Sequence, residues 1–290
     1  MIDFKNYNVK FNENLKNYCT FKIGGNAKYL FVIKTNKDLI NVCKLCKKHN
    51  IKYKIIGMGA NLLFDDLGYN GAIIVNKINN IKFKNSLVYA DGGVNLTSLI
   101  IKASELGLCG LENLSGIPST IAGGIANNVG AFGVEIADSV ESVECYDENF
   151  NKQILTKKEC EFNYRNSVFK HRNLIITKAV LNLMKDEKSL INKRIQNAIK
   201  QKSTTQPLNQ PSAGSVFKRC EIIPAKVIDE LGLKGTKIGG AEISVKHAGF
   251  VVNNSSATSK DVKELINLIK QKVKTVHNVD LKEEIEFVEY

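Results

Sequence analysis

The sequence predicts an α+β fold in which separate helical and strand segments build two or three lobes. Apolar residues recur at helical spacing in several segments, most regularly over 259–276. Short runs rich in β-branched residues lie between these segments and are typical of strands. A chain of 290 residues is long enough for one large domain or for two to three small ones. We predict lobes over residues 1–75, 76–186 and 187–290.

Each lobe has its own predicted elements. In the first lobe, a strand over 28–33 precedes a helix over 36–50 that Thr35 or Asn36 caps. Asn95 is expected to cap a second-lobe helix that ends at Leu106 before a glycine. Pro224 opens a third-lobe helix. The remaining predicted strands are 53–56, 73–75, 78–83, 87–90, 139–146, 153–156, 174–183, 249–253 and 285–288, and the remaining helices are 190–202 and 259–276.

Composition limits the function classes. A net charge of +12 is typical of proteins that bind nucleic acid. However, only four of the 41 basic residues are Arg, and the lysines are scattered along the chain and do not form a basic cluster. We therefore expect no nucleic-acid partner. The segment 1–16 is polar and no stretch reaches the length of an apolar membrane span, so we expect a cytoplasmic protein with no membrane attachment. The chain has seven cysteines, an odd number, and we expect them to be free thiols. The histidines form no metal-binding cluster in the sequence.

Two glycine-rich loops point to a ligand that carries phosphate. The strand 53–56 runs into G-M-G-A-N-L-L at 57–63, and the run 116–133 is dense in Gly and Ala. Glycine inside an element costs roughly 0.5–1 kcal/mol relative to Ala. The usual gain is close approach of backbone N–H groups to a phosphate. Tight turns without a ligand are the alternative. Two such loops together favour a large ligand with a diphosphate.

Three further motifs place polar residues inside ordered segments. Arg165 stands in F-N-Y-R-N-S, Ser215 follows P-S-A-G, and Glu284 precedes the apolar end of the chain. The alternatives are a surface arginine, a turn entering a strand and a solvated edge carboxylate. The motifs of serine hydrolases, zinc metalloproteases and P-loop nucleotidases are absent from the sequence.

Taken in order, these motifs resemble one family, the bacterial UDP-N-acetylenolpyruvoylglucosamine reductases. Nearly the whole chain takes part: T-F-K-I-G-G-N-A at 20–27, the two glycine loops, Y-R-N-S at 164–167, A-G-S-V-F-K at 213–218, H-A-G-F-V-V-N at 247–253 and L-K-E-E-I at 281–285. The short segment between Tyr164 and Asn182 resembles the shorter subtype. Two departures are Ser119, where Gly is usual, and Cys220, where Pro is usual.

The resemblance implies a more specific fold. It predicts a two-lobed FAD-binding domain of the vanillyl-alcohol-oxidase-like type over 1–75 and 76–186, followed by an α/β substrate-binding domain over 187–290. FAD would be bound non-covalently, because the first loop offers neither His nor Cys. The residues expected at FAD are Gly57, Met58, Gly59, Ala60, Asn61, Leu62, Gly116, Ile117, Pro118, Ser119, Thr120, Gly123, Gly124, Ala126, Asn127, Gly130 and Ala131.

The resemblance also implies a reaction. NADPH would reduce UDP-N-acetylglucosamine enolpyruvate to UDP-N-acetylmuramate through FAD, in peptidoglycan precursor synthesis. Arg165 and Glu284 would stabilise developing negative charge, and Ser215 would protonate the enolate carbon. The residues expected at the substrate are Tyr164, Lys218, Arg219 and Asn253. No metal is expected, and we predict a monomer.

The alternatives come from two other classes. One is an FAD-dependent oxidase of a sugar-like alcohol from the same superfamily, which gives no reason for the Arg165, Ser215 and Glu284 motifs. The other is a binding module without enzymatic activity. The residues themselves do not separate NADPH from NADH, because no Arg stands in a recognisable position for the 2′-phosphate.

Overall fold

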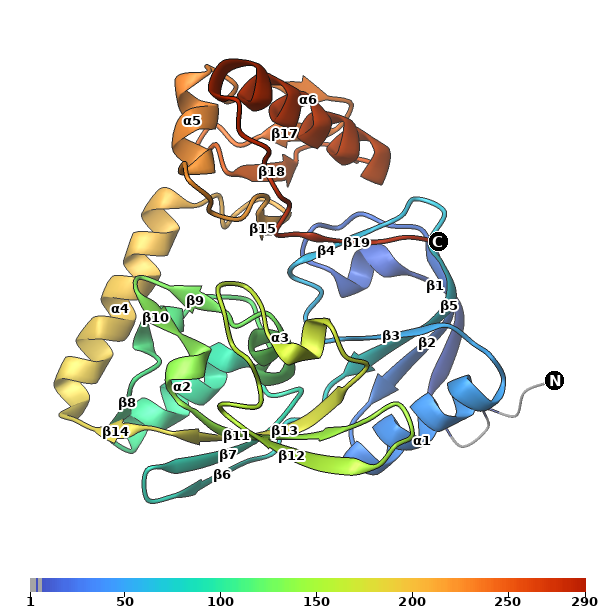
Figure 1. The fold of residues 1–290 in the computed structure, drawn as a ribbon, viewed down its shortest axis with the longest axis vertical. Coiled ribbons are helices and arrows are strands. Elements are labelled where there is room, and N and C mark those ends of the chain that lie inside the picture. The colour runs from blue at the N-terminus through green and yellow to red at the C-terminus, as the bar shows by residue number, and fades with distance from the viewer. Residues whose placement is uncertain (1–3, 5–6) are drawn as a thin grey trace. The chain divides into compact units, whose positions relative to one another are not determined.

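The structure, a computed structural model, describes residue 4 and residues 7–290 (Figure 1). The polar segment 1–16, on which part of the expected cytoplasmic location rests, lies partly outside the described residues. The chain divides into two compact units, each assembled from segments distant in sequence. Unit 1 contains residues 1–8, 31–57 and 74–201, and unit 2 contains residues 9–30, 58–73 and 202–290. One compact unit can contain more than one lobe, so the three lobes stay a prediction.

Four strands from the first quarter of the chain form one sheet. Its strand order is β1-β2-β5-β3. The strands are β1 (Val9–Asn14), β2 (Asn26–Ile33), β5 (Tyr69–Asn76) and β3 (Tyr53–Ile56). The division into units falls within β2 and β5. The predicted helix 36–50 is confirmed as α1 (Asn36–Lys48), and Thr35 caps it by accepting a hydrogen bond from the Asp38 N–H.

Unit 1 is built on an antiparallel sheet of order β12-β11-β13-β7-β6. These strands are β6 (Ile81–Lys84), β7 (Leu87–Asp91), β11 (Val140–Tyr146), β12 (Lys152–Thr156) and β13 (Ile175–Asn182). Helix α2 (Leu96–Glu105) packs on this sheet (Figure 1), because Leu96 and Leu99 share one buried cluster with Val88 and Leu181. Asn95 caps α2 as predicted, with its side chain accepting from the Ser98 N–H.

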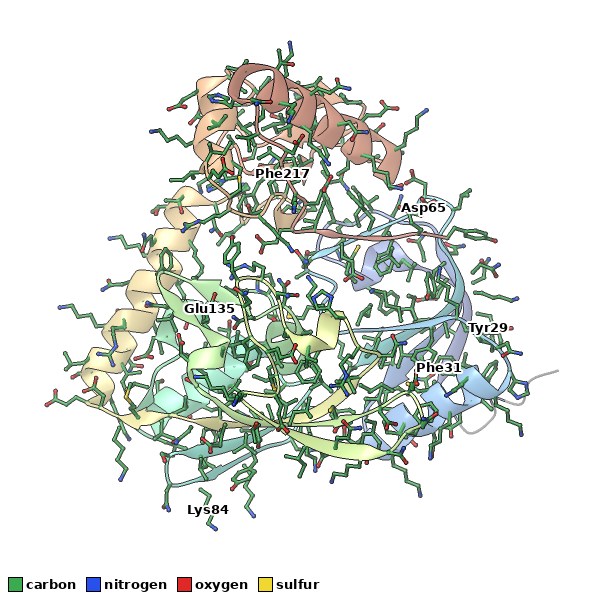
Figure 2. The ribbon with its side chains drawn as sticks, viewed as in Figure 1. Tyr29, Phe31, Asp65, Lys84, Glu135 and Phe217 are labelled. Carbon is green, nitrogen blue, oxygen red and sulfur yellow. The ribbon has the colours of Figure 1, made fainter. Side chains whose placement is uncertain are left out.

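Shorter elements complete unit 1. They are β8 (Leu108–Cys109), α3 (Ile121–Ala126), β9 (Gly130–Ala131), β10 (Val134–Glu135), β14 (Met184–Lys185) and the 3₁₀ turns η2 (Glu112–Leu114), η3 (Ile136–Asp138) and η4 (Val168–Lys170). Helix α4 (Lys188–Thr205) follows, and the division into units falls near its end. Glu135, labelled in Figure 2, ends the β9–β10 hairpin.

Unit 2 is built on a sheet of order β15-β18-β17-β16, with α6 packed on it and α5 against α6. Its elements are η1 (Leu15–Tyr18), β4 (Leu62–Phe64), β15 (Ser212–Ser215), α5 (Pro224–Glu230), β16 (Lys237–Ile238), β17 (Ala241–Ile243), β18 (Phe250–Asn253), α6 (Ser259–His277) and β19 (Glu286–Val288). Helix α6 confirms the clearest periodicity in the sequence, since the five apolar residues of its predicted stripe are buried: Val262, Leu265, Ile266, Ile269 and Val273. Pro224 stands in the first turn of α5, as predicted.

The glycine run differs from the predicted loop, because it contains the helix α3 and the strand β9, which pairs with β10 just after the run. Thr120 caps α3 by accepting from the Gly123 N–H at 3.3 Å. A Cβ at Gly124 would lie 3.1 Å from Val129 Cγ1 and 3.3 Å from Ile136 Cδ1. Close packing against these side chains therefore explains why a helix contains this glycine.

Two strand predictions also needed correction. The strand predicted over 78–83 begins only at Ile81, because Asn76 Oδ1 accepts from the Ile78 N–H and forms a turn there. The segment 62–64, expected to be part of a glycine loop, is the strand β4, which pairs in parallel with β19. That pairing joins residues more than two hundred positions apart, so no local pattern indicates it.

Candidate functional site

The first glycine loop requires glycine for steric reasons at two positions. A Cβ at Gly57 would overlap Thr120 Oγ1 and lie 2.8 Å from Thr120 Cγ2. A Cβ at Gly59, whose φ is +64°, would overlap the Tyr18 carbonyl oxygen. The contact between Gly57 and Thr120 brings the first predicted FAD loop against the second within unit 1.

The first loop also contacts the end of the chain within unit 2. Asn61 Nδ2 donates to the Glu284 carbonyl oxygen at 3.0 Å, and the Glu286 N–H donates to the Asn61 carbonyl oxygen at 2.8 Å. Leu62 then enters β4 and is 8% exposed, so it packs into the protein. A residue predicted at FAD, Asn61, is therefore hydrogen-bonded to a residue predicted to be catalytic, Glu284.

Hydrogen bonds among backbone groups and the Thr97 and Ser119 hydroxyls hold the second glycine loop in tight turns. Gly116 has a φ of +80°, and its N–H donates to Thr97 Oγ1 at 3.1 Å. The Ser119 N–H donates to the Ile117 carbonyl oxygen at 2.8 Å. Ser119 Oγ donates to the Thr120 carbonyl oxygen at 2.9 Å. The Ser119 hydroxyl, which replaces the usual glycine, is thus accommodated within its own turn.

These two loops fit the phosphate-bearing cofactor expected from the sequence. The Gly57 backbone packs directly against the Thr120 side chain, so the two loops meet closely at this point. Bare backbone N–H groups in glycine-rich turns are suited to bind phosphate oxygens. The residues that would hold FAD are those named in each loop from the resemblance, and this assignment stays a prediction.

Arg165 lies in a two-residue turn of unit 1. Asn163 and Asn166 close the turn with two backbone hydrogen bonds of 3.0 Å. The Arg165 guanidinium donates to the Gly130 carbonyl oxygen at 2.7 Å and lies 5.0 Å from the centre of the Tyr164 ring. Its position beside Gly130 brings the Y-R-N-S motif against the second glycine loop.

Ser215 and Glu284 lie on neighbouring segments of unit 2. Ser215 ends β15 and pairs with Phe250 of β18. The following segment pairs with the chain end: Phe217 bridges Glu283, and the Glu284 N–H donates to the Val216 carbonyl oxygen at 2.7 Å. Both side chains are half-buried. The structure therefore places the two predicted catalytic residues on adjacent, backbone-paired segments.

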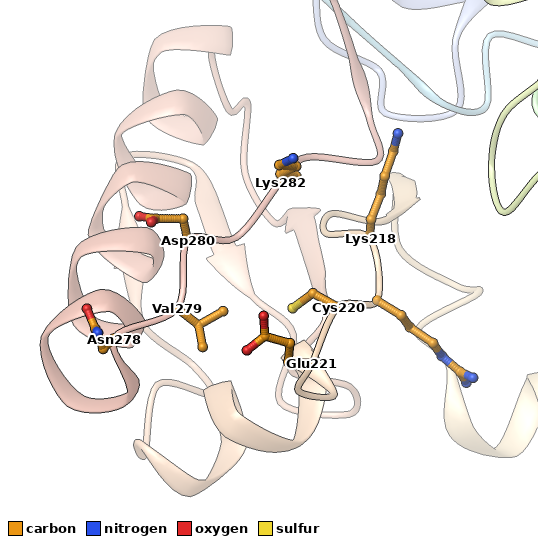
Figure 3. Close-up of a pocket in the computed structure, with 8 residues that line it drawn as sticks. Lys218, Cys220, Glu221, Asn278, Val279, Asp280 and Lys282 are labelled. Atoms are coloured by element: carbon orange, nitrogen blue, oxygen red, sulfur yellow. The ribbon is translucent and has the colours of Figure 1, made fainter.

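A cavity of about 450 Å³ opens next to this pairing in unit 2 (Figure 3). The loop 218–221 and the segment 278–282 lie on its two sides. Three cationic side chains line it, and of its two acids Asp280 is paired with Lys274 at 2.7 Å. The lining residues are Lys218, Arg219, Cys220, Glu221, Asn278, Val279, Asp280 and Lys282. Its volume suits a small organic ligand, and its cations suit an anionic one.

The Asn253 side chain forms hydrogen bonds with backbone groups of the protein itself. Its Nδ2 donates to the Phe21 carbonyl oxygen at 3.2 Å, and its Oδ1 accepts from the Ala257 N–H at 2.9 Å. These hydrogen bonds tie β18 to the N-terminal segment and to the start of α6. Tyr164 is 38% exposed and is placed beside Arg165.

Sequence reasoning missed two residues that the structure brings into these sites. Lys282 lines the cavity, although the sequence pointed only to the acids of its motif. Asn128 is fully buried beside the Arg165 turn, and its Nδ2 donates to the Asn163 carbonyl oxygen at 3.0 Å. The available signal was an Asn next to a glycine-rich turn, since Asn adopts positive φ more readily than most residues.

The described part of the chain offers neither a clustered metal site nor a membrane-spanning helix. Within residue 4 and 7–290, no group of three or more His, Cys, Asp or Glu side chains could hold a metal ion. Within the same residues, no helix has the length and apolar character to cross a membrane.

Comparisons with known proteins agree with the two glycine loops and the C-terminal motifs. Residues 27–149 match the family described as FAD binding domain. Residues 206–288 match the family described as the C-terminal domain of UDP-N-acetylenolpyruvoylglucosamine reductase.

Relatives and a solved structure extend the similarity over almost the whole chain. The UDP-N-acetylenolpyruvoylglucosamine reductase of Caldicellulosiruptor bescii is 40% identical and covers 98% of this chain and 92% of its own. The corresponding Thermotoga enzyme is 39% identical, over 96% of this chain and 93% of its own. The crystal structure of the Thermus caldophilus enzyme has a TM-score of 0.83 at 30% identity, covering 97% and 98% of the two chains.

Proposed function

This chain belongs to the UDP-N-acetylenolpyruvoylglucosamine reductase family, and from that premise we propose which of its residues carry out the reduction. The protein is an FAD-containing, NADPH-dependent oxidoreductase that reduces UDP-N-acetylglucosamine enolpyruvate to UDP-N-acetylmuramate. FAD, when bound by the two glycine loops, supplies the hydride chemistry between NADPH and the enolpyruvyl double bond.

Arg165 and Glu284 stabilise the charge that develops on the substrate. Reduction of the enolpyruvyl double bond moves negative charge toward the substrate carboxylate. A positioned guanidinium can donate two parallel N–H bonds to a carboxylate. Glu284 can assist only as a neutral acid that donates its O–H. Such groups, fixed before the reaction, usually make the largest contribution to catalysis.

Ser215 protonates the carbon that does not receive the hydride. Its hydroxyl is a weak acid in water, so neighbouring groups must stabilise the alkoxide that forms. The backbone pairing of the Ser215 and Glu284 segments supports this role, because it keeps both residues near one part of the substrate. Positioned general acids typically contribute about 10²–10⁴-fold to a rate.

Lys218 and Arg219 bind the diphosphate of the UDP group. Both line the 450 Å³ cavity, and Lys282 adds a third cation there. Charge-assisted hydrogen bonds from such side chains to phosphate oxygens are the strong class of hydrogen bonds. Tyr164 would contact the substrate beside Arg165. Asn253, which the sequence also places at the substrate, would act mainly by holding β18, given its hydrogen bonds.

One observation carries these assignments. Asn61 of the first FAD loop is hydrogen-bonded to the backbone of Glu284, and Glu284 is hydrogen-bonded to the segment that follows Ser215. Asn61 of the cofactor loop and two of the three proposed catalytic residues therefore belong to one hydrogen-bonded network in unit 2. We further propose that the protein acts in the cytoplasm. We also propose that it is a monomer, and size-exclusion chromatography tests the oligomeric state.

NADPH oxidation by the purified yellow protein tests the function. We expect oxidation that depends on UDP-N-acetylglucosamine enolpyruvate and yields UDP-N-acetylmuramate. Oxidation of a sugar-like alcohol by oxygen, with no need for NADPH, would favour the oxidase. A colourless protein that oxidises nothing would favour the binding module.

A further inference from the structure

The backbone of Arg165 is in an unfavourable conformation. Its φ is +50°, in the left-handed region that residues with a Cβ rarely adopt. Such strain persists where surrounding contacts hold it, and it is concentrated at functional sites. The contacts that hold this turn therefore bear on how Arg165 works.

Asn128 supplies a buried side-chain contact to this turn and links it to neighbouring elements. Its Nδ2 donates to Glu135 Oε2 at 2.6 Å and to the Asn163 carbonyl oxygen at 3.0 Å, and its Oδ1 accepts from the Ala137 N–H at 3.3 Å. Asn128 is fully buried. One amide therefore ties the Arg165 turn to the hairpin β9–β10 and to η3.

Backbone carbonyl oxygens at and near Asn128 also accept hydrogen bonds from the Arg165 guanidinium. Arg165 Nη1 donates weakly to the Asn128 carbonyl oxygen at 3.4 Å, and Nη2 donates to the Gly130 carbonyl oxygen at 2.7 Å. A Cβ at Gly130 would lie 3.1 Å from Nη1. Asn128 itself has a φ of +42°, which orients the segment that carries these carbonyl groups.

We propose that Asn128 is a positioning residue for Arg165: its buried amide fixes the strained turn and its backbone accepts the guanidinium. This inference rests on the proposed role of Arg165 toward the substrate carboxylate. It predicts that loss of the amide impairs substrate reduction and leaves NADPH-dependent flavin reduction unchanged, because Arg165 acts only on the substrate.

The test uses Asn128→Gly in the FAD-loaded enzyme, since glycine tolerates the positive φ and removes only the amide. Asn85→Gly is the matched control, because Asn85 has a φ of +55° and is exposed in the turn between β6 and β7. Stopped-flow absorbance measures flavin reduction by NADPH and flavin reoxidation by the enolpyruvyl substrate separately. In Asn128→Gly we expect reoxidation to slow by about tenfold to hundredfold, and reduction to change by less than about twofold.

A double-mutant cycle separates positioning from a structural role. In an Arg165→Ala background, Asn128→Gly should have almost no further effect on reoxidation, because there is no guanidinium left to position. Additive effects, or equal slowing of both half-reactions, would overturn the proposal. Failure of the wild-type enzyme to reoxidise with the substrate would instead contradict the proposed function.

A second pair of variants covers the case in which Asn128→Gly does not fold. Asn128→Asp places a carboxylate oxygen against Glu135 Oε2, and we expect it to slow reoxidation at least as much. Adding Glu135→Gln restores a donor between the two side chains and should recover part of the rate. No difference between Asn128→Asp and the double variant would contradict the hydrogen-bonded positioning.

Discussion

The two regions that carry the proposed catalytic residues are held together differently. In unit 1, two backbone hydrogen bonds close the strained Arg165 turn, and side chains, the Asn128 amide and the Tyr164 ring, hold it further. In unit 2, backbone hydrogen bonds between strands fix Ser215 and Glu284. The Arg165 region therefore depends on particular residues, whereas the Ser215 region depends on the register of strands whose side chains can change.

This difference separates two kinds of mutational effect. Substitution of Ser215 removes a functional group and leaves the hydrogen bonds that place it. Substitution around Arg165 alters the functional group and the stability of its turn together, because the same side chains serve both. The predictions below test this distinction.

Ser215→Ala should have the largest effect. Without its hydroxyl, substrate-dependent flavin reoxidation should slow by about 10²–10⁴-fold, while flavin reduction by NADPH and the thermal midpoint stay as in the wild type. Stopped-flow absorbance and thermal unfolding measure these quantities. Ser212→Ala, at the start of the same strand, is the control. Normal rates in both half-reactions would remove Ser215 from the mechanism.

Arg165 variants test whether strain and function are combined. Both Arg165→Ala and Arg165→Gly should slow reoxidation by about 10²–10³-fold, as expected for loss of a charge-stabilising donor. Arg165→Gly should also be more stable than Arg165→Ala by about 1 kcal/mol, since only glycine adopts the φ of +50° without strain. Urea unfolding gives the difference. Equal stabilities would show that the turn is not strained.

Gly57→Ala tests the side-chain contacts of unit 1 at the cofactor loop. The added methyl group overlaps Thr120 Oγ1, so we expect a loss of about 1–3 kcal/mol in the free energy of unfolding and a lower FAD content. Thr120→Ala removes the two closest atoms, so the cost of Gly57→Ala should be smaller in that background. Absorbance at the flavin band and urea unfolding provide the readouts, and an unchanged cost would place the strain elsewhere.

Alkylation of Cys220 tests where the substrate binds in unit 2. Of the seven cysteines Cys220 is exposed and six are buried. Burial raises the pKa of Cys46 and Cys145 to about 11, so those thiols stay protonated and react slowly near neutral pH. Uridine diphosphate at about ten times its Kd should slow Cys220 alkylation about tenfold. In Lys282→Ala the same concentration should slow alkylation less, because the variant binds uridine diphosphate more weakly. Lys272→Ala is the control, and unaffected labelling would place the diphosphate elsewhere.

Asp261→Asn should have the smallest effect, confined to a helix end in unit 2. The Asp261 carboxylate accepts from the N–H groups of Thr258 at 2.9 Å and Gly240 at 3.2 Å. These hydrogen bonds, led by the one from Thr258, lower the pKa of Asp261. The carboxylate therefore stabilises the fold above its ordinary pKa, and this stabilisation is lost as pH falls through the lowered value.

We expect Asp261→Asn to cost about 1 kcal/mol at pH 7 and progressively less in acid. Urea unfolding at several pH values measures the gap between the variant and the wild type. A gap that does not change with pH would show that the charge of Asp261 contributes nothing.

Local sequence patterns gave good predictions where contacts within one element decide its structure. Helix α6 has the predicted stripe of buried residues, and Thr35 and Asn95 cap the helices that follow them. The glycine run was predicted as a loop because glycine disfavours helices, but α3 forms since Gly124 packs against Val129 and Ile136. That packing involves neighbours whose spatial positions no propensity describes.

The sequence by itself determined the α+β class, the helices and their caps, and the motifs from which the family and its cofactor could be inferred. Only the tertiary structure decided that β19 pairs with β4, that Asn61 contacts Glu284, that Lys282 lines a cavity with Lys218, and that Asn128 holds the Arg165 turn. The physical reason is range. Caps and helical stripes depend on residues within one or two turns, whereas strand pairing and side-chain hydrogen bonds join residues that only the folded chain brings together.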